Sequence, residues 1–196
     1  MQHFDLCVIG GGPAGYAAAM RAIDIGKRVL LVERDRIGGT GIYNGALTSK
    51  TLWEIAQRVS STNELMRERG REPFRLSWDE ILKTLNEAAF ERKYLHACHM
   101  QLLASTPDGK FRHERGHARM VDPHTVRIER PGSTTDISAE RIIVATGSRP
   151  RSLPNIVTDE EFILSSDGIF SLEQQPSSIV IIGAGGHGLA CAHYLS

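Results

Sequence analysis

The fold of this 196-residue chain is decided by the stretch FDLCVIGGGPAG, residues 4–15. Its apolar half contains β-branched residues and stops abruptly at three glycines, which predicts a buried strand that feeds a tight turn. The Ala-rich residues 13–26 predict a helix, and residues 29–32 predict a second buried strand. A strand, a glycine turn, a helix and a strand in this order form a right-handed βαβ unit.

The glycine turn fits the pattern G-x-G-x-x-G, in which each glycine has its own physical task. Gly10 permits the tight turn, Gly12 leaves room for a pyrophosphate against the backbone, and Gly15 lets the helix pack closely on the strand. The helix that begins at Pro13 and Ala14 offers unpaired N–H groups and a partial positive charge to the phosphates. The turn therefore predicts a dinucleotide site.

An acidic residue supports this interpretation. Glu33 ends the second strand, where its carboxylate can accept hydrogen bonds from both hydroxyls of a ribose. Arg34 follows it directly and is counted with it as a cofactor-binding candidate. The alternative is a glycine turn that serves packing alone, for which no acidic residue at this position would be needed.

A second glycine motif, GAGGHG, occupies residues 183–188 after the apolar residues 179–182, which predict another strand. Gly183, Gly185 and Gly188 are its nucleotide-binding candidates, and His187 is more simply an exposed turn histidine than a catalytic one. A parallel strand needs a neighbour, and no later strand follows this motif. We therefore expect the sequence to be truncated within a second domain.

The region between the two motifs predicts a change from helices to short strands. The alternating Arg and Glu of residues 67–75 indicate a solvated helix end rather than a basic recognition patch. The expected elements are a glycine-rich loop at 38–45, helices at about 48–68 and 77–103, an antiparallel meander at 112–138 with turns at Asp122-Pro123 and Pro131-Gly132, a buried strand at 141–145, and an irregular segment at 153–175 with a short helix near 166–172.

The overall composition argues against several classes of protein. Lys and Arg together number 23, as do Asp and Glu, so the chain lacks the basic excess of a nucleic-acid binder. The N-terminus lacks the basic region of a signal peptide, and residues 6–9 are too short an apolar run to span a bilayer. We expect a cytoplasmic protein with no nucleic-acid or membrane partner.

The cysteines predict neither a disulfide framework nor a metal site. Cys7, Cys98 and Cys191 are odd in number and widely spaced, with no C-x-x-C pair. Cys98 lies in the sequence HACH, but positions two apart on a helix point in different directions. We therefore expect no metal ligation by this segment.

Together these motifs resemble the pyridine nucleotide–disulfide oxidoreductases, a flavin-dependent family that includes dihydrolipoamide dehydrogenase, glutathione reductase, mercuric reductase and the soluble transhydrogenase. The resemblance covers nearly all of the chain. The segments that carry it, in order, are CVIGGGPAGY at 7–16, Gly38-Gly39-Thr40 with Ser49-Lys50, Gly116-His117-Ala118 with DPHTV at 122–126, ATGSRP at 145–150, Ser165-Ser166-Asp167, and the second glycine motif.

The resemblance implies an α/β fold: a Rossmann-like FAD-binding domain with a small antiparallel β-meander at 1–150, and the truncated start of an NAD(P)-binding Rossmann domain at 151–196. FAD and NAD(P)H are the implied cofactors, and a homodimer is expected only for an intact chain. The residues carried over from the family as FAD-binding candidates are Gly39, Thr40, Lys50, His117, Ala118, Ala145, Thr146 and Gly147.

The sequence departs from the family at its redox cysteines. The family has C-x-x-x-x-C between Gly-Gly-Thr and Ser-Lys, and here those positions hold Gly41 and Ala46. Neither forms a thiolate, so no disulfide can relay electrons between flavin and a substrate. We also expect these small residues to open space on one face of the flavin.

Lys50 is the candidate catalytic residue that remains. In the family this lysine pairs with a glutamate of the second glycine-motif helix, a position that is Ala190 here. Without its carboxylate, beside an apolar flavin face, the charged form of the lysine is disfavoured. The side chain then either acts as a neutral donor or points to solvent.

For an intact chain, the resemblance and the departures from it imply an NAD(P)H-linked flavoenzyme that passes electrons from reduced flavin directly to a small-molecule acceptor. For these 196 residues alone, we expect only FAD binding. Two alternatives stay open. One is a non-catalytic module that binds FAD or another nucleotide. The other is a truncated remnant of a dihydrolipoamide dehydrogenase-like enzyme, which cannot fold stably because its second domain lacks partner strands.

Overall fold

A computed structural model of the chain describes residues 2–195, which divide into two compact units. The first unit extends to Gly41 and resumes over Arg92–Ser148. The second comprises Ile42–Glu91 and the residues from Arg149 onward. Among the described residues, no helix combines the length and the apolar character that crossing a membrane requires.

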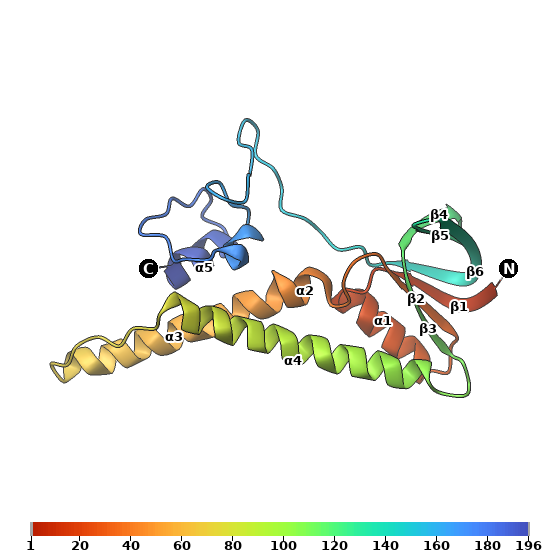
Figure 1. Cartoon of the computed structure of the whole chain (residues 1–196), viewed down its shortest axis with the longest axis horizontal. Coiled ribbons are helices and arrows are strands. Elements are labelled where there is room, and N and C mark those ends of the chain that lie inside the picture. Colours follow the sequence, from red (N-terminus) through yellow and green to blue (C-terminus); the bar gives the residue numbers. More distant parts are fainter. Residues whose placement is uncertain (1, 196) are drawn as a thin grey trace. The chain divides into compact units, whose positions relative to one another are not determined.

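The first unit is built on a six-stranded sheet with the order β3-β2-β1-β6-β5-β4 (Figure 1). The strands from β3 to β6 in this order are parallel to their neighbours, and β4 and β5 continue the sheet in antiparallel fashion. Helix α1 connects β1 to β2. The elements are β1 (Gln2–Ile9), α1 (Pro13–Asp24), β2 (Val29–Glu33), β3 (Phe111–Arg115), β4 (His117–Asp122), β5 (Thr125–Arg130) and β6 (Ser133–Val144).

The predicted βαβ unit is confirmed, and so is the antiparallel meander, which consists of β4, β5 and the start of β6. Two expectations about its strands were wrong. β3 pairs in parallel with β2, outside the meander. The strand expected at 141–145 is the end of the single 12-residue strand β6. Local pattern does not reveal either feature, because both depend on which distant strand becomes the hydrogen-bonding neighbour.

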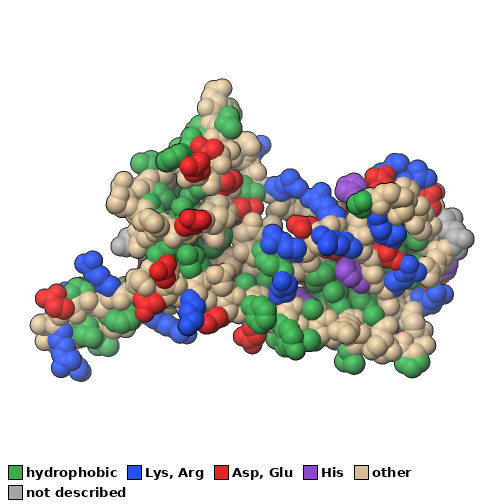
Figure 2. All heavy atoms as spheres, viewed as in Figure 1, with side chains coloured by type: hydrophobic (Ala, Val, Ile, Leu, Met, Phe, Trp, Pro, Cys, Tyr) green, Lys and Arg blue, Asp and Glu red, His purple; other side chains and the backbone are tan. Residues whose placement is uncertain are grey.

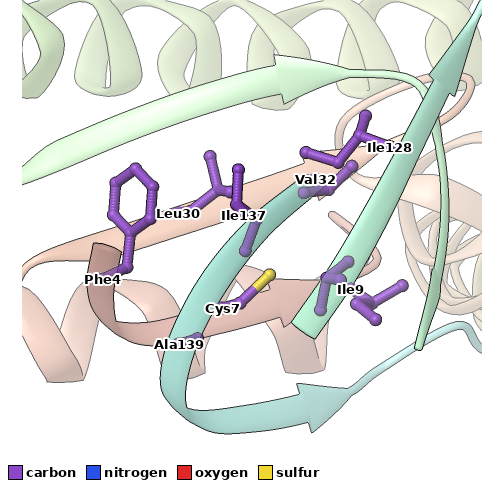
Figure 3. Close-up of a cluster of buried hydrophobic side chains, with 9 residues drawn as sticks. Phe4, Cys7, Ile9, Leu30, Val32, Ile128, Ile137 and Ala139 are labelled. Carbon is purple, nitrogen blue, oxygen red and sulfur yellow. The ribbon is translucent and has the colours of Figure 1, made fainter. Parts of the chain in front are cut away.

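Side-chain alternation in the strands separates two hydrophobic clusters, one on each face of the sheet. In β2, Leu30 and Val32 join one cluster and Val29 and Leu31 join the other, as a period of two requires. Figure 3 shows the first cluster, where Leu30, Val32 and Cys7 lie beside side chains of β5 and β6 such as Ile128. The second contains Ala19 and Ala22 of α1 and Met100 of α4, so helices cover that face.

The two long predicted helices are confirmed as α3 (Ala46–Glu68) and α4 (Trp78–Ala104). Helix α4 begins with a capping box: Ser77 Oγ accepts the Glu80 N–H, and Glu80 Oε2 accepts the Ser77 N–H at 2.8 Å. The segment before it is held by Asn63, whose side chain bonds both backbone groups of Phe74. The expected loop at 38–45 was wrong in part, because Gly39–Tyr43 forms the short helix α2.

The part of the second unit that follows residue 148 has little regular structure. The short helix expected near 166–172 is confirmed as η1 (Gly168–Ser171), and the Trp78 indole donates a hydrogen bond to the Leu172 carbonyl at 2.9 Å. Helix α5 (Gly186–Leu195) follows the second glycine motif.

The strand expected at 179–182 does not form in the structure. A strand is defined by hydrogen bonds to a neighbour, and no described strand pairs with this segment. Its apolar side chains are correspondingly open to solvent, with Val180 88% and Ile182 69% exposed. Figure 2 shows hydrophobic side chains at the surface of the second unit.

Candidate functional site

The first glycine turn leaves the sheet at the end of β1, between β2 and β6. Gly10 has φ +107°, and a Cβ atom there would lie 2.3 Å from the Ala145 carbonyl oxygen, so glycine is required twice over. A Cβ on Gly15 would lie 1.8 Å from the Gly10 carbonyl oxygen. These two glycines therefore perform the tasks that the motif assigns them: the sharp turn and the close approach of α1 to β1.

Gly12 differs from its neighbours because the space beside it is open. A Cβ atom on Gly12 would meet no atom within 4 Å. Gly12 is the N-cap of α1 and no side chain caps the helix, so the free N–H groups of its first turn are left for a ligand. Open space in front of an uncapped helix N-terminus suits the diphosphate of a dinucleotide.

The Glu33 carboxylate lies directly beside this turn. Its Oε2 accepts the Gly11 N–H at 2.6 Å and its Oε1 accepts the Asp35 N–H at 2.8 Å. The two donors hold the carboxylate in place, and each oxygen keeps a further lone pair for a ribose hydroxyl. Arg34 is exposed next to it.

Three further segments of the first unit reach the turn. Gly38 donates its N–H to the Gly11 carbonyl at 2.8 Å, and a Cβ on Gly39 would lie 3.4 Å from the Gly12 Cα. Ala145 donates its N–H to the Ile9 carbonyl at 2.7 Å. The chain thus converges at the carboxyl ends of β1, β2 and β6, where open α/β sheets bind ligands.

The other candidates of the first unit lie around this convergence. Thr146 follows Ala145 directly, and Gly147 has φ +76°. His117 is exposed on β4, with its Nδ1 atom 4.0 Å from a Glu129 carboxylate oxygen, and Ala118 packs against the first hydrophobic cluster. The exposed Thr40 belongs to α2.

The Lys50 candidate lies on α3 in the second unit, where its side chain is exposed and makes no ion pair with a described residue. Helix α3 packs against α5: the Trp53 ring lies 4.5 Å from the His193 ring. The helix that carries Lys50 therefore contacts the helix that carries Ala190. The position of Lys50 relative to the first glycine turn stays a prediction.

The second glycine turn repeats the geometry of the first. Gly183 has φ +117°, and a Cβ on Gly188 would lie 1.9 Å from the Gly183 carbonyl oxygen. Gly185 has open space beside it and accepts the Leu189 N–H at 3.0 Å, the first backbone hydrogen bond of α5. His187 is exposed, as expected, but it lies in the first turn of α5 and not in the loop before it.

Gly41 and Ala46, which stand where the family has its redox cysteines, differ in their surroundings. A Cβ atom on Gly41 would lie 2.3 Å from Pro13 Cγ, so the proline ring fills the space beside this glycine. The expectation that glycine opens space is wrong at this position. Ala46 is exposed at the start of α3.

The three thiols do not form a redox pair. Cys7 is buried in the sheet, and burial raises its pKa to about 12. Burial also raises the pKa of Cys191, whereas Cys98 is exposed. No group of three or more His, Cys, Asp or Glu within residues 2–195 is arranged to hold a metal ion.

Some residues of the site were not identified from the sequence. Gly11 bonds to Glu33, and a Cβ there would lie 2.6 Å from Ile37 Cδ1. Gly116 donates its N–H to the Glu33 carbonyl at 2.9 Å. A glycine at a strand junction was the available signal for both, but its partner is set by tertiary structure.

The chain matches the family described as pyridine nucleotide-disulphide oxidoreductase over residues 4–196. It belongs to this family. The chain is 35% identical to the soluble pyridine nucleotide transhydrogenase of Mycobacterium tuberculosis (strain ATCC 25177 / H37Ra), over 98% of this chain and 41% of that protein. It is 31% identical to the dihydrolipoyl dehydrogenase of Bacillus subtilis (strain 168), over 98% of this chain and 42% of that protein.

A solved structure shares the fold. The HOCl-induced flavoprotein disulfide reductase RclA of Escherichia coli, solved as a Cu(II) complex, superposes with a TM-score of 0.78 at 24% identity, over 99% of this chain and 40% of that one. The chain thus spans about two fifths of the length of these relatives. Members of the family use FAD and NAD(P)H.

Proposed function

We propose that the first glycine turn binds the diphosphate of FAD, and that the chain acts in an oxidoreductase that moves electrons between NAD(P)H and an acceptor. The observation that carries this proposal is the open space beside Gly12 in front of an uncapped helix, with the Glu33 carboxylate held next to it. Bound FAD supplies the chemistry, by accepting a hydride and passing on two electrons.

The protein contributes binding and orientation. The N–H groups of α1 and the carboxylate of Glu33 would hold the diphosphate and a ribose. The second turn, with Gly183, Gly185 and Gly188, would hold the diphosphate of NAD(P)H by the same backbone geometry. Lys50 stays the candidate catalytic residue that the resemblance implies.

We further propose that electrons leave the flavin without a disulfide relay, toward a small-molecule acceptor. Gly41 and Ala46 stand where the family has its cysteines, and neither carries a sulfur atom. Cys7 cannot replace them, because the pKa of this buried thiol is about 12 and the thiolate is the reactive form. A homodimer is proposed for a longer chain.

The substitution Gly12→Leu tests the binding site. Gly12 has φ −71° and free space around it, so the fold accepts a side chain there, but the side chain would fill the space of the diphosphate. We expect FAD affinity to fall about a hundredfold or more, equal to about 2.8 kcal/mol. Flavin fluorescence titration measures the affinity, and the melting temperature verifies folding.

Asp24→Asn serves as the control, because Asp24 is an exposed carboxylate at the end of α1 opposite the turn. Its affinity should equal that of the wild type. Equal FAD affinity of Gly12→Leu and wild type would overturn the proposed site.

A second candidate function, a module that binds FAD without catalysis, is favoured by one observation. Within residues 2–195 no strand pairs with residues 179–182, so the second turn has no supporting sheet there. Anaerobic titration with NADH and NADPH separates the two functions. Bleaching of the flavin absorbance supports the oxidoreductase, and bound flavin that resists bleaching supports the module. Turnover of lipoamide or glutathione would contradict electron transfer without a disulfide.

A further inference from the structure

An aromatic cluster joins α1 to α4 next to the proposed FAD site. The Tyr16 hydroxyl oxygen lies 2.5 Å from His99 Nδ1. The His96 ring stacks on the Tyr16 ring, with the ring centroids 4.2 Å apart and an angle of 13° between the ring planes. We name Tyr16, His96 and His99 the Tyr16 cluster. Two titratable imidazole rings of α4 therefore contact the single phenol ring of α1.

The Tyr16 cluster is coupled directly to the phosphate turn. The Tyr16 N–H donates to the Gly12 carbonyl at 2.9 Å and so closes the first turn of α1. Met100 and Leu103, on the same helix as the two histidines, pack with Ala19 and Ala22 of α1 in the second hydrophobic cluster. Contacts to Tyr16 therefore hold the turn of helix whose N–H groups face the ligand.

His96 tolerates only its neutral form in this arrangement. Its Nδ1 atom is buried and has no hydrogen-bond partner among the described residues, so a proton placed there would be an unsatisfied buried donor. The ionisable groups that act on it are Arg92 and His99, both on α4, and Tyr16 faces it from α1. Burial, Arg92 and His99 together lower the pKa of His96.

We propose that His96 and His99 are positioning residues for FAD: through Tyr16 they hold the first turn of α1, and protonation of His96 releases it. This inference rests on the proposed FAD function of the turn. It assigns to α4 a role in cofactor binding although α4 carries no residue of the glycine motif.

The direction of the pH effect follows from the lowered pKa of His96. The neutral ring is compatible with the cluster at all pH values above the ordinary His range, so FAD affinity is constant there. Below about pH 6.5, His96 binds a proton more readily in the released state than in the intact cluster. The equilibrium therefore shifts toward the released state, and FAD binds more weakly. We therefore expect FAD affinity to be lower at pH 5.5 than at pH 7.5, because the released state binds the proton that the intact cluster disfavours.

The test is a fluorescence titration of the full chain with FAD at pH 5.5, 6.5 and 7.5. His96→Phe keeps an aromatic ring against Tyr16 but cannot be protonated, so its affinity should be independent of pH. Tyr16→Phe loses the bond to His99 and should bind more weakly at pH 7.5. His3→Phe is the matched control, an exposed histidine at the start of β1 that bonds Ser138. It should keep the wild-type profile.

Two results would overturn the proposal: wild-type affinity that does not change with pH, or a His96→Phe profile equal to that of the wild type. A merely structural contact would lower affinity without flattening the profile. If His96→Phe does not fold, His96→Gln replaces it with the same expected flat profile.

Failure of the proposed function is distinguishable from failure of the cluster. If the wild type binds no FAD even at pH 7.5, the proposed function fails. The pH sensitivity of the Tyr16 cluster is then tested by thermal unfolding of the same proteins. Acidification should lower the melting temperature of the wild type more than that of His96→Phe. Equal shifts would overturn the cluster as well.

Discussion

The two glycine turns have the same local geometry in different surroundings. Gly10 and Gly183 share a positive φ near +110°, at +107° and +117°, and the glycine five positions later packs on each of them. The first turn emerges from the middle of a sheet and receives Glu33 and Ala145 from other strands. The second follows a segment with no described strand beside it.

This difference separates what a motif builds from what a fold adds. The close contact between two glycines is local, and it forms at both turns although only the first lies in a sheet. The carboxylate, the neighbouring strand ends and the burial come from long-range pairing. The geometry of the glycine turn is therefore encoded within about six residues, whereas the groups that surround the first turn are supplied by the sheet.

Thiol labelling sharpens the comparison with the largest expected effect. Cys7 is fully buried on β1, and because its pKa is about 12, only about one molecule in ten thousand is a thiolate at pH 8. Cys191 on α5 is partly exposed. Reaction with a chromogenic disulfide reagent should modify the exposed Cys98 first and the partly exposed Cys191 more slowly. Cys7 should react about a thousandfold or more slowly than Cys98, after global unfolding. Equal rates for all three thiols would contradict a buried β1.

Matched glycine substitutions give the next largest effect. Gly15→Val places a side chain against the Gly10 carbonyl in the centre of the first unit, and should destabilise it by about 4 kcal/mol. Gly188→Val meets the same local clash at the second turn, where no sheet depends on it. Urea unfolding monitored by circular dichroism should show a large loss for the first variant only. A loss of similar size for Gly188→Val would indicate that the second turn is part of the same cooperative unit.

Core truncation separates the two apolar segments more gently. Ile128 of β5 is 1% exposed in the first hydrophobic cluster, so Ile128→Val should cost about 1 kcal/mol. Val180 is 88% exposed, so Val180→Ala should change stability by less than about 0.5 kcal/mol. Denaturation midpoints measure both. A larger cost at Val180 would reveal burial of this segment in solution.

Acid titration should give the smallest effect on stability, and the effect should have the same direction in both units. The Arg127 guanidinium holds the pKa of Asp136 below its usual range, and backbone N–H groups of Ile163, Glu161 and Phe162 do the same for Asp159. Each carboxylate therefore contributes stability above about pH 4, the ordinary Asp range, and loses it as the pH falls through its lower folded pKa.

The variants Asp136→Asn and Asp159→Asn should each flatten the fall in melting temperature between pH 5 and 2. Asp136→Asn acts on the first unit, where Asp136 joins β6 to β5 through a bidentate pair with Arg127. An unchanged acid profile in this variant would mean that the exposed pair contributes nothing measurable.

The sequence was sufficient where structure depends on neighbours along the chain. Gly10, Gly12 and Gly15 were identified from spacing, and α3 and α4 from composition and punctuation. The interaction of Gly116 with Glu33 was not identified, because the pair is far apart in the chain. The strand expected at 179–182 failed for the same reason: apolar, β-branched residues favour a strand only when a partner strand is present.

The candidate site shows the same contrast between features set by nearby sequence and features set by long-range packing. Sequence spacing identified Glu33 but not its two backbone donors, and it did not reveal that the Pro13 ring occupies the space beside Gly41. Distances of this kind arise when a helix and a turn pack, and no pattern in either segment contains them. The Tyr16 cluster was likewise invisible, since Tyr16 and His99 are 83 positions apart.

Strand β6 has a mechanical consequence for the first unit. Residues 133–138 of this one strand are bonded to β5, and residues from Ile137 to its end are bonded to β1, with no interruption between the two ladders. A force applied at one end of this continuous strand is therefore transmitted to its other end. Occupation of the turn after β1 should therefore slow amide hydrogen exchange as far away as β5, and the meander and the parallel strands should melt in a single step.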